Sequence, residues 1–315
     1  MGTVIESLEV TARRWHTRRS ALHLAVSAAK ACLRQAGRRA DEVDLLINAG
    51  IYRDRNLAEP ALAALIQEDI GANAEDPHDG GHGTFSFDVA NGACGVLTAL
   101  QIADGFLRSN TIGCALVVAS DADPGRRRSV RFPFSPVGAA MLCSWRDDER
   151  GLGRVQWVNV PDGGENFRAT VGLDHSRNIL RFSVSPEMDE QFATAGAEAA
   201  RRCLRDAGLK LDEVDQIIAA PARERYRAAL ATRLDISVDR ITVAADSRMH
   251  TAALVAGLQN ADPVRPGGST LLIAAGAGVT AGAALYRASV NAGSDWIRPQ
   301  SGARRESASP TPPSA

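Results

Sequence analysis

The stretch "AAKACLRQAGRRADEVDLLINAG" (28–50) returns as "AARRCLRDAGLKLDEVDQIIAAP" (199–221), shifted by 171 positions, and this repeat decides the fold. Thirteen of the 23 aligned positions are identical. Each copy predicts an amphipathic helix that ends at a glycine, followed by an acidic turn and a short apolar strand. A shift of 171 residues is far longer than a solenoid period, so it indicates duplication of a whole half of the protein.

Later segments repeat the same order of elements. "CALVVAS" (114–120) resembles "TLLIAAG" (270–276), and both predict buried apolar strands. "VGAAMLCSW" (137–145) corresponds in the same way to "GVTAGAALYR" (278–287). Buried strands that alternate with amphipathic helices predict an α/β fold whose sheets are covered on both faces.

The repeat also predicts the domain organisation. We expect an N-terminal half over residues 1–150 and a C-terminal half over 151–287, related by a pseudo-twofold axis. After Arg287 the chain becomes rich in Ser, Pro, Gly and Arg, which cannot support a hydrophobic core. Residues 288–315 are therefore expected to form a disordered tail.

Bulk composition narrows the function classes. The 315 residues carry 36 Lys and Arg against 37 Asp and Glu, so no excess of basic charge favours nucleic acid or an anionic membrane as a partner. Five cysteines without a CxxC pair are typical of a reducing cytoplasm. No apolar run reaches the roughly 18 residues of a membrane span, and no signal peptide is visible. We expect a cytoplasmic protein. The loop "DPHDGGHG" (76–83) matches no zinc pattern, so no metal is expected.

Two motifs carry a family resemblance. "FDVANGACGVLTALQIADGFLRS" (87–109) and "GAGVTAGAALYR" (276–287), together with the duplicated halves, resemble the thiolase superfamily, and within it ketoacyl-acyl-carrier-protein synthase III. The resemblance runs from about Ser20 to Arg287 and implies a five-layered α-β-α-β-α fold. It implies no cofactor, with acyl-coenzyme A or acyl carrier protein thioesters as substrates. The N-terminus lacks most of the family segment that grips coenzyme A, so that role is not carried over to Trp15 and Arg18.

Members of that family use a Cys, His and Asn set, in which the Cys carries the acyl chain at a helix N-terminus. The family pattern puts this Cys five residues after the Asp of "FDV" and eleven before the next "AD" Asp. From Asp88 and Asp104 both counts reach Ala93, and Cys94 is the next residue. One helical residue is a turn of about 100° and a rise of about 1.5 Å. We expect Ala93 to face the pocket and Cys94 to pack behind it, unless a local bulge returns Cys94 to the pocket.

The other two family positions are changed as well. The resemblance puts Ala220 at the His position, and thirty residues further on it puts His250 at the Asn position. Alanine can neither donate a hydrogen bond nor transfer a proton, whereas an imidazole can do both. The glycine-rich turn is intact, and the resemblance implies an oxyanion site formed by the backbone of Gly276, Ala277 and Gly278.

These positions leave two hypotheses within fatty-acid or polyketide-type acyl metabolism. In the first, the chain is a catalytically degenerate subunit that dimerises with an active ketoacyl-synthase-III-like paralogue or with itself, with acyl carrier protein as a further candidate partner. In the second, it is an acyltransferase that moves an acyl group from acyl carrier protein or coenzyme A through Cys94, with His250 as the base.

Overall fold

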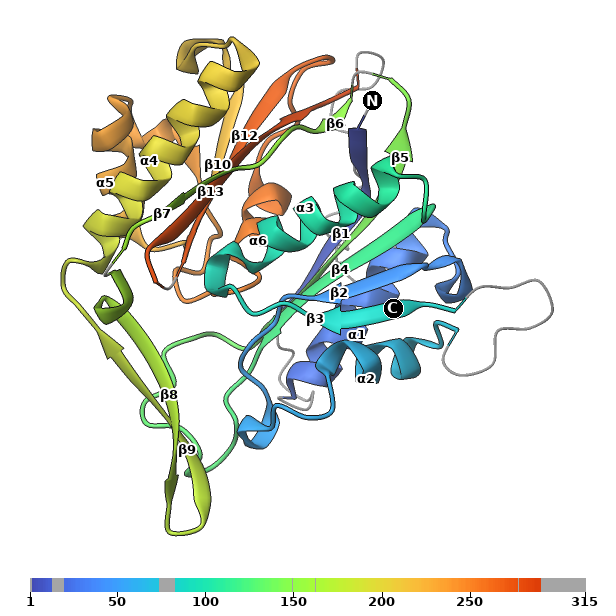
Figure 1. The fold of residues 1–315 in the computed structure, drawn as a ribbon, viewed down its shortest axis with the longest axis vertical. Helices are drawn as coiled ribbons and strands as arrows, with labels where there is room; N and C mark the ends of the chain where they lie inside the picture. The colour runs from blue at the N-terminus through green and yellow to red at the C-terminus, as the bar shows by residue number, and fades with distance from the viewer. Residues whose placement is uncertain are drawn as a thin grey trace, which may run out of the picture.

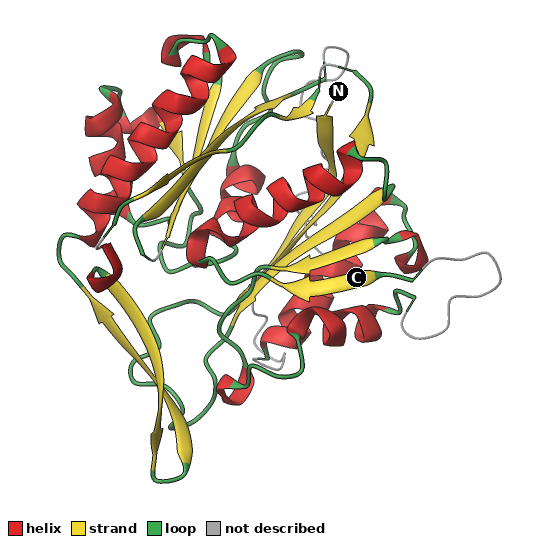
Figure 2. Ribbon diagram, in the orientation of Figure 1, coloured by secondary structure: helices red, strands yellow, loops and turns green. Residues whose placement is uncertain are grey.

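The structure is a computed structural model, and it describes residues 2–12, 20–73, 83–148, 150–161, 163–276 and 278–289. Two large sheets and their helices make up the body, and a long hairpin projects from it (Figures 1 and 2). The earlier part of the chain forms β1 (Gly2–Ala12), α1 (Ala21–Ala36), β2 (Leu45–Asn48), α2 (Leu62–Ile70), β3 (Phe85–Asp88), α3 (Gly95–Arg108), β4 (Cys114–Asp121) and β5 (Val137–Arg146). The later part forms β6 (Gly151–Leu152), β7 (Gln156–Asn159), β8 (Phe167–Asp174), β9 (Arg177–Val184), α4 (Met188–Ala207), β10 (Gln216–Ala220), α5 (Glu224–Leu234), β11 (Ile241–Thr242), α6 (Ala253–Asn260), β12 (Ser269–Gly276) and β13 (Thr280–Arg287).

The first sheet has the strand order β1-β5-β4-β2-β3. Strands β4, β2 and β3 run parallel, while β5 is antiparallel to both β4 and β1. Helices α1 and α2 pack on one face of this sheet and α3 packs on the other. With both faces covered, every residue of β2 and β4 is buried, as their continuous apolar sequences predict.

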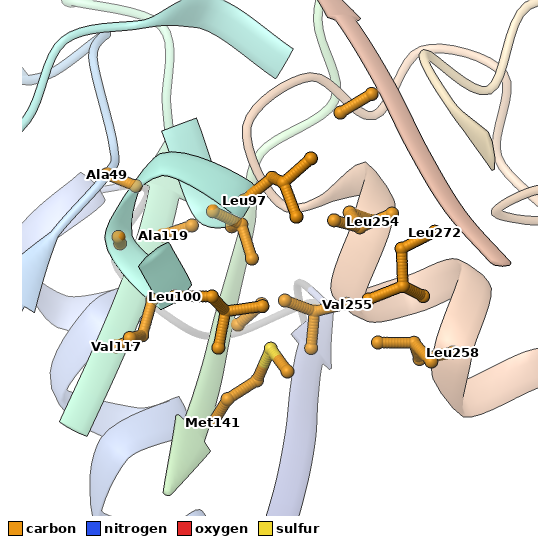
Figure 3. Packing of buried hydrophobic residues seen from close by; sticks show 14 of the residues in the cluster. Ala49, Leu97, Leu100, Val117, Ala119, Met141, Leu254, Val255, Leu258 and Leu272 are labelled. Carbon is orange, nitrogen blue, oxygen red and sulfur yellow. The ribbon is translucent and has the colours of Figure 1, made fainter. Parts of the chain in front are cut away.

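The second sheet has the order β11-β10-β12-β13-β6, and β7 also pairs with β13. Its outer face is covered by α4 and α5, and α6 packs on its inner face. Between the two sheets lie α3 and α6, whose side chains fill the central core (Figure 3). Leu97 and Leu100 of α3 meet Leu254 and Val255 of α6 in this core. The order of layers is α-β-α-β-α, which confirms the expected thiolase-like α/β fold.

The two copies of the sequence repeat form the same local structure. Helices α1 and α4 end at Gly37 and Gly208, which adopt left-handed φ values of 67° and 65°. In each copy an aspartate then ties the acidic turn to the next strand of its sheet. Asp44 Oδ2 accepts hydrogen bonds from the N–H groups of Gly113 and Cys114, and Asp215 Oδ2 accepts one from Ser269 N–H. Both aspartates therefore fix the start of the neighbouring central strand, β4 or β12.

The halves also differ from each other. Helix α3 has 14 residues and α6 has eight, and the β8–β9 hairpin has no counterpart among the described residues before β5. We propose that the halves meet between β5 and β6, near residue 150. Several sequence predictions fall outside the described residues, namely those for Trp15 and Arg18, for residues 76–82 of the histidine loop and for the tail after Ser289. Among the described helices, none is long and apolar enough to cross a bilayer.

Close backbone packing between α1 and β5 generates a stability prediction. A Cβ atom at Gly138 would collide with the carbonyl oxygen of Leu24 in α1, whereas a Cβ at exposed Gly105 in α3 would meet no atom. We expect Gly138→Ala to lower the free energy of unfolding by about 2 kcal/mol or more, because α1 must move away from the sheet. Gly105→Ala is the matched control and should raise it by about 0.5–1 kcal/mol, since alanine favours the helix. Denaturant unfolding gives the free energy of unfolding of both variants. A Gly138→Ala variant as stable as the wild type would contradict the close packing of α1 on β5.

Candidate functional site

The start of α3 lies against the end of β12. A short 3-10 turn (Gly92–Cys94) leads into the helix, and Cys94 is its N-cap residue. A Cβ atom at Gly276 would lie 3.3 Å from Cys94 Sγ and 3.2 Å from the carbonyl oxygen of Asn91. These distances are tight for a Cβ contact, so glycine at 276 allows the two elements to approach closely.

A cavity of about 430 Å³ opens beside this junction. Its wall is largely apolar, with Ala93, Phe134, Phe167, Met188, Phe192 and Ala275 among the lining residues. Charged and polar groups complete it, and they include Asp189, Arg223, Glu224, Arg225, Arg248 and His250. The cavity has the size and the mixed lining that are typical of small-molecule sites.

Ala93 lines this cavity, and Cys94 is not among its lining residues. The Cys94 side chain is fully buried in the central core, where its Sγ donates a hydrogen bond to the carbonyl oxygen of Thr280 at 3.4 Å. Burial raises the pKa of Cys94 to about 12. The sulfur is therefore a protonated thiol near neutral pH, and such thiols react slowly.

The position that the resemblance assigns to histidine lies at the end of β10. Ala220 is fully buried there, and the next residues, Pro221 and Arg223, line the cavity. Arg223 makes a bidentate ion pair with Asp189, with Nε–Oδ1 at 2.7 Å and Nη2–Oδ2 at 3.1 Å. Asp189 could not be identified from the sequence, because nothing in the first turn of α4 marks it as the partner of Arg223, 34 positions away.

His250 precedes α6 and lines two hollows. One is the cavity above, and the other has a volume of about 570 Å³ and is lined also by Tyr52, Asn91 and Phe167. The imidazole stacks on Phe134 with ring centroids 4.2 Å apart, and Tyr52 lies on it at 5.3 Å. Its Nδ1 atom is buried and lies 3.4 Å from Asp121 Oδ2.

Asp121 ends β4 and has no exposed side-chain surface. Its Oδ2 accepts hydrogen bonds from Thr251 N–H (2.9 Å) and Oγ1–H (2.6 Å), and its Oδ1 accepts one from Tyr52 N–H (3.1 Å). Burial alone would raise the pKa of this carboxyl. The charge of His250 and the hydrogen bonds from Thr251 together outweigh burial and hold the pKa below its usual value. The carboxylate form is therefore favoured beside the imidazole.

Asp121 is not among the residues predicted from the sequence, although its position after an apolar run is informative. An acidic residue that directly follows the apolar run "CALVVAS" ends a buried strand and must find partners there. Its partners, Tyr52 and Thr251, lie 69 and 130 positions away in sequence.

The glycine-rich turn is only partly described. Gly276 lines the cavity, Gly278 has a φ of 72°, and Ala277 lies outside the described residues. Of the sequence candidates, the structure brings Ala93, His250 and Gly276 to one cavity and leaves Cys94 in the core behind it. Within the described ranges, no group of three or more His, Cys, Asp or Glu side chains is arranged to hold a metal ion.

Comparisons with known proteins reveal similarity in both sequence and fold. Residues 204–288 match the family described as 3-oxoacyl-[acyl-carrier-protein] synthase III C terminal. The chain is 29% identical over 289 residues to a beta-ketoacyl-[acyl-carrier-protein] synthase III of Novosphingobium aromaticivorans, covering 84% of this chain and 83% of that protein.

Solved structures share the fold. The 3-oxoacyl-[acyl-carrier-protein] synthase III of Aquifex aeolicus superposes with a TM-score of 0.75 at 21% identity, covering 91% of this chain and all of that one. The priming beta-ketosynthase of the R1128 polyketide pathway superposes with a TM-score of 0.74 at 19% identity, covering 91% of this chain and 96% of that one. The chain is a ketoacyl-acyl-carrier-protein-synthase-III-like protein of the thiolase superfamily.

Proposed function

We propose that the chain is a catalytically degenerate subunit of an acyl-transferring or condensing complex and that it pairs with an active ketoacyl-synthase-III-like paralogue. One observation carries the proposal. Ala93 lines the cavity at the position where the resemblance puts the nucleophile, while Cys94 does not line it and is buried in the core. A side chain without a nucleophilic atom cannot carry an acyl chain as a thioester.

The cavity itself remains suited to an acyl group. It is about 430 Å³ in volume, and aromatic and aliphatic side chains form most of its wall. The relatives are named as synthases that act with acyl carrier protein, and one fold neighbour is named as a polyketide-priming synthase. These names support acyl thioesters as the ligand class.

The edge of the first sheet supports pairing with another chain. Among the described residues, β3 pairs only with β2, so its outer backbone groups can accept another strand. Phe85 on this strand is 59% exposed, and its ring lies 5.2 Å from that of Phe87. An exposed aromatic side chain on an open strand edge is typical of a protein interface.

The alternative function is acyl transfer through Cys94 with His250 as base. It requires the Cys94 sulfur to leave its hydrogen bond with Thr280 and to enter the cavity that His250 lines. It also requires a thiolate, which burial opposes. The geometry therefore supports the subunit better.

A cysteine moved by one position tests which side chain faces the cavity. We expect the thiol of Ala93→Cys, made in a Cys94→Ala background, to react with iodoacetamide at least about 10-fold faster than the native Cys94, because it faces the open cavity. Mass spectrometry of the labelled peptide gives both rates. If native Cys94 were labelled as fast or faster, the assignment of the two positions would be wrong.

Removal of the native thiol tests its role. We expect Cys94→Ala to leave the activity of the assembled complex within a few-fold and to lower the free energy of unfolding by about 1 kcal/mol, since only packing atoms are lost. Intact mass after incubation with acyl-coenzyme A should show no acyl adduct on the wild-type chain. A rate loss of about 10³-fold in Cys94→Ala would establish the acyltransferase instead.

A charge on the sheet edge tests the interface. We expect Phe85→Lys to weaken copurification with the active paralogue by about 10-fold or more, because a lysine opposes strand pairing at an edge. Val238→Lys, at a partly exposed apolar position away from β3, is the matched control and should copurify like the wild type. Equal recovery of Phe85→Lys would remove β3 as the pairing surface.

A further inference from the structure

A buried histidine–aspartate pair stands at the place where the two hollows meet. His250 lines both hollows, and its Nδ1 faces Asp121 at 3.4 Å. Nδ1 is itself buried, while 11% of the side chain is exposed, so the exposed surface belongs to other atoms of the side chain. An imidazole whose Nδ1–H faces a carboxylate keeps its lone pair on Nε2, which is the arrangement of a general base.

The surroundings hold this pair in one geometry. The imidazole packs against the rings of Phe134 and Tyr52, which also stack on each other with centroids 5.3 Å apart. Asp121 is held by hydrogen bonds from Thr251 and Tyr52, so it cannot turn away from the imidazole. A separation of 3.4 Å is long for a hydrogen bond, and such contacts often shorten only when substrate binds.

We propose that the chain, which is degenerate only in the acyl-enzyme chemistry of the family, hydrolyses an acyl thioester without an acyl-enzyme, with His250 as the general base. The proposal rests on the acyl-thioester cavity of the proposed function. The acyl group lies in the cavity beside Ala93, and a water molecule lies against the imidazole. Asp121 is a positioning residue that fixes the tautomer and orientation of His250.

The hydrolysis takes place in two steps. The water oxygen forms a bond to the thioester carbonyl carbon while Nε2 of His250 takes a proton from that water. The carbon–sulfur bond of the tetrahedral intermediate then breaks, and the leaving thiolate takes the proton back from the imidazolium. The products are a carboxylic acid and a free thiol, and His250 returns to its starting state.

Other charged groups share the cavity with His250. Asp189 is paired with Arg223, and Glu224, Arg225 and Arg248 line the same wall. Asp121 is the carboxylate that the structure pairs with the imidazole.

The test measures hydrolysis of straight-chain acyl-coenzyme A esters, from acetyl to lauroyl, by the full-length chain alone. Mass spectrometry of the released coenzyme A and acid avoids reagents that react with protein thiols. We expect hydrolysis above the buffer rate. We expect His250→Gln to lose on the order of 10²-fold or more of the rate. Asp121→Asn should lower kcat and leave KM within a few-fold, because Asp121 positions the base and does not line the cavity.

Matched controls separate chemistry from folding. His175 also lies beside an aspartate, at 3.7 Å from Asp174, but its side chain is 99% exposed, so His175→Gln should keep the wild-type rate. Thermal unfolding shows whether the His250 variants fold, and added imidazole should restore part of the rate to His250→Gly. The proposal is overturned if no ester is hydrolysed faster than in buffer, if His250→Gln matches the wild type, or if Cys94→Ala abolishes the rate. Copurification with the paralogue is independent of these outcomes, so it tests the subunit role separately.

Discussion

The arrangement of the site depends on one buried carboxylate. Asp121 ends β4 in the first sheet and accepts two hydrogen bonds from Thr251, which precedes α6 in the second half of the chain. An ionised carboxylate without exposed surface is strongly destabilising unless hydrogen bonds and a nearby cation replace its water. The chain can satisfy Asp121 only when the start of α6 lies against the end of β4. That docking also brings His250 and the aromatic rings around it to the cavity.

The packing around Cys94 does not depend on the reactivity of its thiol. The Cys94 sulfur touches the backbone of β12 and β13, near Gly276 and at Thr280. This contact holds the start of α3 against the second sheet, and it requires a small side chain but no reactivity. Ala93 belongs to the same buried cluster but also lines the cavity, which Cys94 does not.

Much of this fold could be predicted from the sequence because its signals are local. The repeat contains its own helix stop, acidic turn and strand, and Gly37 and Gly208 adopt the left-handed caps that such stops require. Counting residues from Asp88 in β3 and from Asp104 in α3 also gave different predictions for Ala93 and Cys94, because both aspartates lie close to these positions in the sequence. The pairs Asp121–His250 and Asp189–Arg223 could not be found in this way. Their members lie 129 and 34 positions apart, and only the packed halves bring them together.

The two halves of the molecule are not equally similar in every layer. The 23-residue segments that still share thirteen identities supply the outer helices α1 and α4 and their turns, which mainly cover a sheet. The inner helices α3 and α6 differ in length, and the cavity opens at their N-terminal ends. The two halves are therefore most alike in the outer layers and least alike in the central layer, so the molecule has a nearly symmetric cover around an asymmetric centre.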